Sequence, residues 1–308
     1  MAFGLKHLFG LKGVSKQDIT TIIDTAVSFR EVLDRPIRIV PTLKGVAVLN
    51  LFYEESTRTR ISFELAERRL SAEVVSFVKN SSSVSKGESL RDTVRNIEAM
   101  KIDLIVVRHK SPGTPQFLAA HTNCKIINAG DGAHEHPTQA LLDMMTMRQH
   151  FGSLEGLRVL IVGDILHSRV ARSDIWGLKT MGAHVDVCGP ATLIPLEMGN
   201  FGVNIYFNFD EIISDYDVIY MLRIQKERQQ AGLLSSSREY TAMFGLTRDR
   251  VKRTKRDAVI MHPGPINRGI ELDYEVADSD KSLILEQVTN GEAIRMAVLY
   301  LLSGRSEQ

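Results

Sequence analysis

Apolar residues follow two different spacings along this chain. Short continuous apolar runs, such as Val46–Tyr53, are typical of strands buried on both faces of a parallel sheet. Elsewhere apolar residues recur every three or four positions, as in a helix with one buried face. Strands are therefore expected at 45–53, 73–78, 103–107, 125–128, 158–162, 184–188, 203–206, 217–221 and 258–261, and helices at 15–34, 56–70, 90–100, 137–151, 170–181 and 292–302.

The order of these elements predicts an α/β protein with two domains, each a mainly parallel sheet flanked by helices. The join is expected near Gly152–Gly156, which gives domains at 1–150 and 151–308, with the last helix (292–302) packing back on the first domain. The segment 225–250 is charged and has no clear period, so we expect a mobile surface loop with a short helix there.

Composition narrows the classes of function. The chain has 308 residues, 44% of them hydrophobic, which fits two ordinary domains. Its formal net charge of +1 gives no support to a nucleic-acid or membrane-surface role. It has two cysteines and no apolar run approaching the ~20 residues of a membrane span. We therefore expect a cytoplasmic protein without a disulfide framework or a cysteine-rich metal site.

The stretch Ser56-Thr-Arg-Thr-Arg60 is the first candidate for chemistry. It follows a strand and opens a helix, where backbone N–H groups and the helix dipole favour an anion. Hydroxyls add short donors, and guanidinium groups match phosphate oxygens. A Ser-Thr helix start is usually only an N-cap, and a nearby arginine is usually a surface charge. Two hydroxyl residues alternating with two arginines exceed what capping requires. We therefore give phosphate binding the same weight as a purely structural role for this stretch.

Further polar residues follow other strand ends, where ligands of parallel α/β sheets bind. Taken singly, each has an ordinary explanation: a strand-end charge for Arg108, a helix cap for His136, a loop ion pair for Lys86 and solvated charge for Arg169 and Arg223. Their recurrence at one kind of position favours a site for anionic substrates.

In chain order, these motifs resemble the carbamoyltransferase family. The motifs are Ser56-Thr-Arg-Thr-Arg60, Lys86-Gly-Glu88, Arg108-His109, Gly130-Asp-Gly132 with His136-Pro-Thr-Gln139, Arg223-Ile-Gln-Lys-Glu-Arg228 and His262-Pro-Gly-Pro265. The resemblance runs from about Leu5 to Leu302, and the Arg223–Arg228 motif points to the aspartate branch. There are two departures: Ser85 precedes Lys86 where some relatives have a second lysine, and Gly264 stands where some have leucine.

The resemblance implies transfer of the carbamoyl group of carbamoyl phosphate to the α-amine of L-aspartate, an early step of pyrimidine synthesis. Its implied phosphate ligands are Ser56, Thr57, Arg58 and Thr59, and Arg108 would bridge the phosphate and the carbonyl oxygen. Thr59, Arg108 and His136 would form an oxyanion hole, usually the largest catalytic contribution. Gln139 and the carbonyl groups near Pro263 and Gly264 would bind the carbamoyl NH2.

For the second substrate, the resemblance implies binding of the aspartate carboxylates by Arg169, Arg223 and Gln225, with Lys86. Ser82 (or Ser83) and Lys86 would come from the neighbouring chain, which implies a homotrimer with shared sites. We expect the Ser56 motif and the pair Arg169 and Arg223 to face one another. No metal or cofactor is implied, and a regulatory or pathway-enzyme partner stays open.

Other functions remain to be weighed. An ornithine-using relative would be expected to carry His-Cys-Leu-Pro near the end and a Ser-Met-Gly motif, and this chain has neither. A non-catalytic relative would bind carbamoyl phosphate as a phosphate-binding or scaffolding protein but would form no product. A nicotinamide-dependent dehydrogenase is suggested by Val159–Asp164, but the residues after Gly163 do not make G-x-G-x-x-G.

Overall fold

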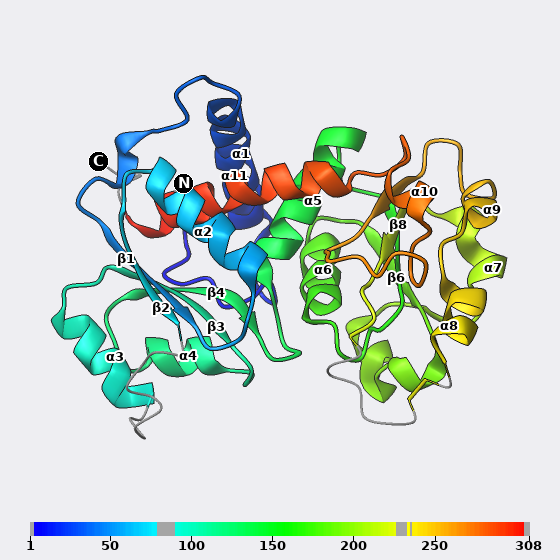
Figure 1. Cartoon of the computed structure of the whole chain (residues 1–308), viewed down its shortest axis with the longest axis horizontal. Helices are drawn as coiled ribbons and strands as arrows, with labels where there is room; N and C mark the ends of the chain where they lie inside the picture. Colours follow the sequence, from blue (N-terminus) through cyan, green and yellow to red (C-terminus); the bar gives the residue numbers. More distant parts are fainter. Residues whose placement is uncertain (1–2, 79–89, 226–232, 235, 305–308) are drawn as a thin grey trace. The chain divides into compact units, whose positions relative to one another are not determined.

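The computed structural model describes residues 3–78, 90–225, 233–234 and 236–304, which form two compact units (Figure 1). The first unit comprises Met1–Leu142 with Thr289–Gln308, and the second comprises Asp143–Val288. The boundaries fall within two helices, α5 and α11, so each of these helices contributes residues to both units.

The first unit contains a four-stranded parallel sheet in the order β2-β1-β3-β4. Consecutive strands are joined through helices, as parallel pairing requires. The strands are β1 (Ala47–Phe52), β2 (Glu73–Val78), β3 (Leu104–His109) and β4 (Lys125–Asp131). The helices are α1 (Lys16–Leu33), α2 (Thr57–Arg69), α3 (Leu90–Ala99), α4 (Thr114–Ala119), the start of α5 (Pro137–Phe151) and most of α11 (Ile284–Leu302), with a 3-10 turn at Pro41–Leu43.

One face of this sheet packs on α3 and α4. Side chains at alternate strand positions share a face, and the apolar ones here bury a common core. Its members are Leu49, Leu51, Tyr53, Val94, Ile97, Ile105, Val107, Leu118, Cys124 and Ile126. Helix α11 is attached to α2 within the same unit (Figure 1), because Arg295 donates to Ser62 at 2.9 Å and Arg69 forms a 2.8 Å ion pair with Glu292.

The second unit contains a five-stranded parallel sheet in the order β7-β6-β5-β8-β9. The strands are β5 (Arg158–Val162), β6 (His184–Cys188), β7 (Ile205–Tyr206), β8 (Val218–Met221) and β9 (Val259–Met261). The helices are most of α5, α6 (Arg169–Thr180), α7 (Phe209–Ile212), α8 (Ser237–Phe244), α9 (Arg248–Val251), α10 (Tyr274–Ala277) and the start of α11, with 3-10 turns at Ala191–Leu193, Leu196–Phe201 and Ile213–Asp215. Aromatic residues of α7 and α8, Phe209, Tyr240 and Phe244, complete its core.

The predicted fold class, two mainly parallel sheets flanked by helices, is confirmed. The differences are local. Strand β4 continues to Asp131 and α11 begins at Ile284, both beyond the expected limits. The segment 225–250 needs correction, since its described part contains two helices, and Tyr240 and Phe244 of α8 are buried. Within the described residues, no helix combines the length and apolarity that crossing a membrane would need.

Candidate active site

The carboxyl ends of β1, β3 and β4 lie side by side in the first unit. Phe52 at the end of β1 pairs with Arg108, and His109 pairs with Asp131 at the end of β4. Because parallel strands all end at the same edge of a sheet, the segments that follow them are gathered there. The structure thus brings together the motif at the start of α2, Arg108 and the connection that leads into α5.

Helix α2 begins at this edge with Ser56 in the N-cap position. The Ser56 side chain makes no capping hydrogen bond to the helix, so capping does not account for this hydroxyl. Thr59 is buried, whereas Thr57 and Arg58 are exposed. The N–H groups of a first helical turn have no partner within the helix. This end of α2 therefore combines backbone N–H groups, hydroxyls and a guanidinium group, which are the donors that a phosphate group requires.

Arg108 is held in one orientation by two other segments of this edge. Its Nη2 donates to Glu54 Oε1 at 2.8 Å, and its Nη1 donates to the carbonyl oxygen of Ala129 at 3.1 Å. The side chains of Arg108 and Glu54 are only 12% and 13% exposed, so solvent screens this ion pair less than a surface pair. Glu54 follows β1 and Ala129 lies in β4, so the guanidinium group is fixed to both neighbours of its own strand.

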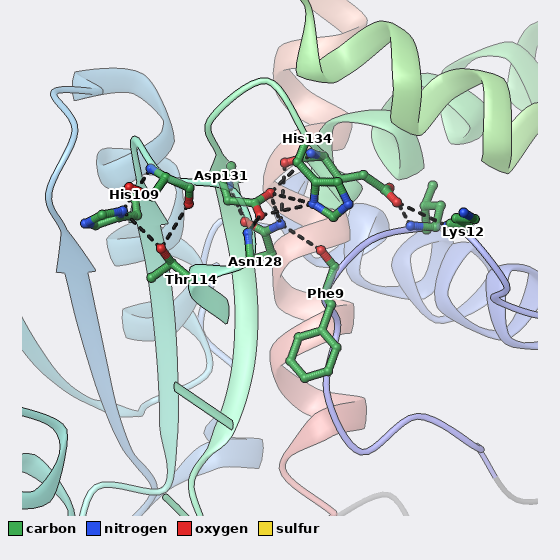
Figure 2. Close-up of polar contacts among 12 residues, drawn as sticks. Phe9, Lys12, His109, Thr114, Asn128, Asp131 and His134 are labelled. Atoms are coloured by element: carbon green, nitrogen blue, oxygen red, sulfur yellow. Dashed lines mark hydrogen bonds and ion pairs between the residues drawn. The ribbon is translucent and has the colours of Figure 1, made fainter. Parts of the chain in front are cut away.

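The connection between β4 and α5 carries His136. The carbonyl oxygen of this buried residue accepts hydrogen bonds from the N–H groups of Gln139 at 3.0 Å and Ala140 at 3.3 Å, and so starts α5. Figure 2 shows the polar contacts that hold the preceding residues, centred on Asp131 and Asn128. Burial alone would raise the pKa of Asp131, but hydrogen bonds, the strongest of them from His134, outweigh burial and lower it.

In the second unit, the carboxyl ends of β5, β8 and β9 are likewise adjacent. Val162 pairs with Met221, and Tyr220 pairs with Met261. The segments that follow these strands therefore share one edge, and they contain the residues predicted to bind aspartate and the carbamoyl NH2, namely Arg169, Arg223, Gln225, Pro263 and Gly264.

Arg169 is the first residue of α6 and is 4% exposed. Ser168 caps this helix, with its hydroxyl accepting from the Ala171 N–H at 3.1 Å. Gln225 Nε2 donates to the carbonyl oxygen of His167 at 3.1 Å. This contact ties the segment after β8, which also carries Arg223, to the turn that precedes Arg169.

Gly163 at the end of β5 is explained by packing. Its φ of +127° favours glycine, and an added Cβ would lie 2.9 Å from the Tyr240 hydroxyl and 3.3 Å from Leu222 Cβ. The space above this residue is thus filled by side chains of the protein. A glycine that lets a dinucleotide pyrophosphate approach would need that space open, so the dehydrogenase alternative loses its main support.

The loop that carries Pro263 and Gly264 is anchored through His262. His262 Nδ1 accepts from the Gly264 N–H at 2.8 Å, which leaves the proton on Nε2, 3.4 Å from Glu271 Oε1. The His262 N–H donates to Gln287 Oε1 at 3.0 Å. The side-chain position of His262 and the start of the loop are therefore set by separate buried contacts.

Gln287 leads to a pair of buried carboxyl groups. Its Nε2 donates to Asp143 Oδ1 at 2.6 Å, and the Tyr220 hydroxyl donates to Asp143 Oδ2 at 2.8 Å. Asp174 of α6 is also fully buried, and its pKa is raised well above its ordinary value by burial and by neighbouring Asp143. A second charge beside Asp143 in this core is unfavourable, so the fold favours the protonated form of Asp174.

Two family models together match nearly the whole chain. Residues 6–149 match the carbamoyl-P binding domain of aspartate/ornithine carbamoyltransferase, and residues 155–302 match the Asp/Orn binding domain of the same family. The chain belongs to the aspartate/ornithine carbamoyltransferase family. The resemblance inferred from the motifs is therefore confirmed.

Individual carbamoyltransferases give closer comparisons. The aspartate carbamoyltransferase catalytic subunit of Gemmatimonas aurantiaca is 55% identical over 299 residues, which are 97% of this chain and 94% of that protein. The aspartate transcarbamoylase of Trypanosoma cruzi, solved with carbamoyl phosphate and aspartate, has a TM-score of 0.86 at 30% identity, covering 97% of each chain. The ornithine carbamoyltransferase of Pyrococcus furiosus also reaches 0.86 at 28% identity, covering 99% of each chain. The fold thus serves both branches, while the higher sequence identity lies with the aspartate branch.

Not every residue expected at the site of this carbamoyltransferase can be placed. Ser82, Ser83 and Lys86 lie outside the described residues. Conversely, the contact of Glu54 with Arg108 was missed, although two glutamates directly after a strand were a visible signal. The role of Gln287 had no local signal, because its partners His262 and Asp143 lie far away in the sequence.

Proposed function

We propose that this chain is a catalytic chain of aspartate carbamoyltransferase. It transfers the carbamoyl group of carbamoyl phosphate to the α-amine of L-aspartate and releases phosphate and N-carbamoyl-L-aspartate, in pyrimidine synthesis. This activity was predicted from the motifs and is the one named for the relative that is 55% identical over 97% of this chain. The observation that carries the assignment is the strand register that places Arg108 beside the end of β1, where the Ser56 motif follows.

Carbamoyl phosphate binds at the edge of the first unit in this proposal. Ser56, Thr57, Arg58 and Thr59 hold the phosphate through hydroxyl, N–H and guanidinium donors at the start of α2. Arg108, oriented by Glu54 and Ala129, bridges the phosphate and the carbonyl oxygen.

The carbamoyl group itself is bound by a second set of residues. Thr59, Arg108 and His136 stabilise the oxygen that gains charge as the carbonyl carbon is attacked. Gln139 and the carbonyl groups of Pro263 and Gly264 accept hydrogen bonds from the NH2 group. Anchoring of the 262–265 loop by His262 and Gln287 supports this role, because an acceptor is selective only if its position is fixed.

Aspartate is bound through its two carboxylates by Arg169, Arg223 and Gln225, together with Lys86. Guanidinium groups suit this task because they form two parallel hydrogen bonds with a carboxylate. Burial of Arg169 supports the proposal, since a desolvated cation binds an anion more strongly than a surface cation does.

The reaction needs no covalent enzyme intermediate. The lone pair of the neutral α-amine attacks the carbonyl carbon, and the tetrahedral intermediate then breaks the C–O bond to phosphate. The departing phosphate takes up the proton that the amine loses. The protein contributes by orienting two anionic substrates and by stabilising the developing oxyanion.

The assembly belongs to the proposal as well. We place Ser82 and Lys86 in the site of a neighbouring chain, which requires a homotrimer acting in the cytoplasm. Two buried, unbridged cysteines are compatible with a reducing compartment. The relative's name as a catalytic subunit suggests that a regulatory partner exists in some assemblies.

Steady-state assays of product formation with aspartate and with ornithine test the activity. Arg58→Ala should lower kcat/KM for carbamoyl phosphate about 100-fold or more, because a charge-assisted contact to the leaving phosphate is lost. The exposed side chain of Arg58 should leave the melting temperature nearly unchanged. Arg248→Ala, at a side chain 72% exposed, is the matched control and should behave like wild type. A preference for ornithine, or full activity of Arg58→Ala, would contradict the proposal.

A further inference from the structure

Glu135, the residue directly before His136, makes contacts that have no part in the substrate binding proposed above. Glu135 is 2% exposed, and its carboxylate accepts two backbone hydrogen bonds from the N-terminal segment 9–12. The Leu11 N–H donates to Oε2 at 2.6 Å, and the Lys12 N–H donates to Oε1 at 3.3 Å. An added Cβ on Gly10 would lie 2.3 Å from Oε1, so the segment approaches as closely as a glycine allows. This carboxylate fastens the start of the chain to the connection between β4 and α5.

The main chain of Glu135 is held as firmly as its side chain. Its N–H donates to Asp131 Oδ1 at 3.2 Å, and its carbonyl oxygen accepts from the Asp131 N–H at 3.2 Å. Asn128 Nδ2 donates to the carbonyl oxygen of Phe9 at 2.7 Å and to Asp131 Oδ1 at 2.8 Å. Figure 2 shows Phe9, Asn128 and Asp131 joined in this network, which lies at the end of β4. Both ends of the contact with segment 9–12 are therefore fixed to the sheet.

His136 takes its position from these neighbours. Its own carbonyl oxygen starts α5, and the residue before it is bound through its N–H, its carbonyl oxygen and its carboxylate. A change in the Glu135 main-chain torsions would swing the imidazole relative to the sheet edge. The carboxylate is the part of this restraint that reaches outside the connection, to a segment more than 100 residues away in sequence.

We propose that Glu135 is a positioning residue for His136, and that segment 9–12 is thereby part of the catalytic edge of the first unit. The effects on kcat and KM that this role predicts rest on the proposed carbamoyl transfer. Removing the carboxylate frees the connection, so the imidazole loses its alignment with the carbonyl oxygen of the substrate. Phosphate binding depends on the start of α2 and is retained. The loss therefore falls on kcat and leaves KM for carbamoyl phosphate nearly constant.

A double-mutant cycle on the full chain tests this coupling. Glu135→Ala should lower kcat about 10- to 100-fold, as expected for misalignment of about 1 Å, with KM for carbamoyl phosphate changed less than about 3-fold. In a His136→Ala background the same substitution should have no further effect on kcat. Equal losses in both backgrounds would overturn the proposal, because general damage to the fold multiplies with loss of the imidazole.

Two companion variants separate positioning from folding. Glu135→Gln keeps one acceptor for segment 9–12 and should restore part of kcat, and it serves as the test protein if Glu135→Ala does not fold. Asp18→Ala is the matched control, because Asp18 also accepts a hydrogen bond from the N-terminal segment, from the Gly4 N–H at 3.0 Å, but lies on α1. Its kcat should equal that of wild type, and a loss like that of Glu135→Ala would overturn the proposal.

A measurement without substrate keeps this inference separate from the proposed function. NMR of the free protein labelled in histidine rings resolves the His136 resonance, assigned by its disappearance in His136→Ala. Glu135→Gln should shift this resonance, whereas Asp18→Ala should leave it in place. Absence of carbamoyl transfer in the wild type would contradict the proposed function alone. An unshifted His136 resonance would overturn the positioning role in either case.

Discussion

Substitution of Glu67 tests how burial controls charge in the first unit. Glu67 lies on α2 and is fully buried, and Asn50 Nδ2 donates to its Oε2 at 2.7 Å. Burial raises the pKa of Glu67 from 4.5 to about 8, although the hydrogen bond from Asn50 favours the ionised form. Asn50 Oδ1 and Glu67 Oε1 are both buried, and neither has a hydrogen-bond partner among the described residues. A proton on Glu67 removes a buried charge. It also turns one carboxyl oxygen of Glu67 from an acceptor without a partner into a hydrogen-bond donor.

The folded chain therefore keeps a proton that the unfolded chain releases. This contribution to stability is fully present below pH 4.5 and is lost as the pH rises toward about 8. Each pH unit within that window costs the folded state about 1.4 kcal/mol, which amounts to about 3 kcal/mol at pH 7. Glu67→Gln keeps the size and the donor of the protonated acid but does not titrate. We expect it to be more stable than wild type by up to about 3 kcal/mol at pH 7, and by little near pH 4.5.

Urea denaturation followed by circular dichroism, at several pH values and one chain concentration, measures this difference. Hydrogen exchange of peptides from β1 and α2 shows whether the gain lies in the first unit. The same substitution at exposed Glu31 on α1 is the control, since solvent already stabilises its charge. Equal stability of Glu67→Gln and wild type at pH 7, or a gain that grows as the pH falls, would refute the reasoning.

Further predictions concern the second unit and the assembly. Asp174→Asn should raise the free energy of unfolding at pH 7, because burial and Asp143 raise the pKa of Asp174, and the gain should shrink as the pH falls toward 3.8. Thermal melts across pH measure this, and a loss of stability at pH 7 would show that the folded chain instead favours the ionised form of Asp174. Mixing inactive Lys86→Ala and Arg58→Ala chains should restore part of the carbamoyl transfer if neighbouring chains share sites. No recovery after mass spectrometry has verified subunit exchange would argue against the homotrimer with shared sites.

Much of the proposed site can be predicted from local sequence. Ser56–Arg60 combines a strand end, a helix start and the donors for a phosphate group, all within a few residues. Such a pattern depends on neighbouring residues, so it can be recognised without knowing the rest of the fold. The same holds for His136 before Pro137, since a proline there marks the start of a helix.

Other features depended on partners far along the chain. Tyr240 and Phe244 of α8 lie in a charged segment without a local period, so the sequence did not predict their burial. They are buried because they pack against the rest of the core of the second unit. Glu135 looked like an ordinary polar residue until the fold placed the N–H groups of Leu11 and Lys12 at its carboxylate.

The sequence by itself determined the order of strands and helices, the parallel α/β class, and the donors that mark the proposed phosphate site. These follow from the spacing of apolar residues and from chemistry within short segments. The tertiary structure alone decided which carboxyl groups are buried and which segments hold Arg108 and His136 in place. Those properties arise from strand register and from the exclusion of water by distant parts of the chain, because both depend on contacts that form only when the whole unit is folded.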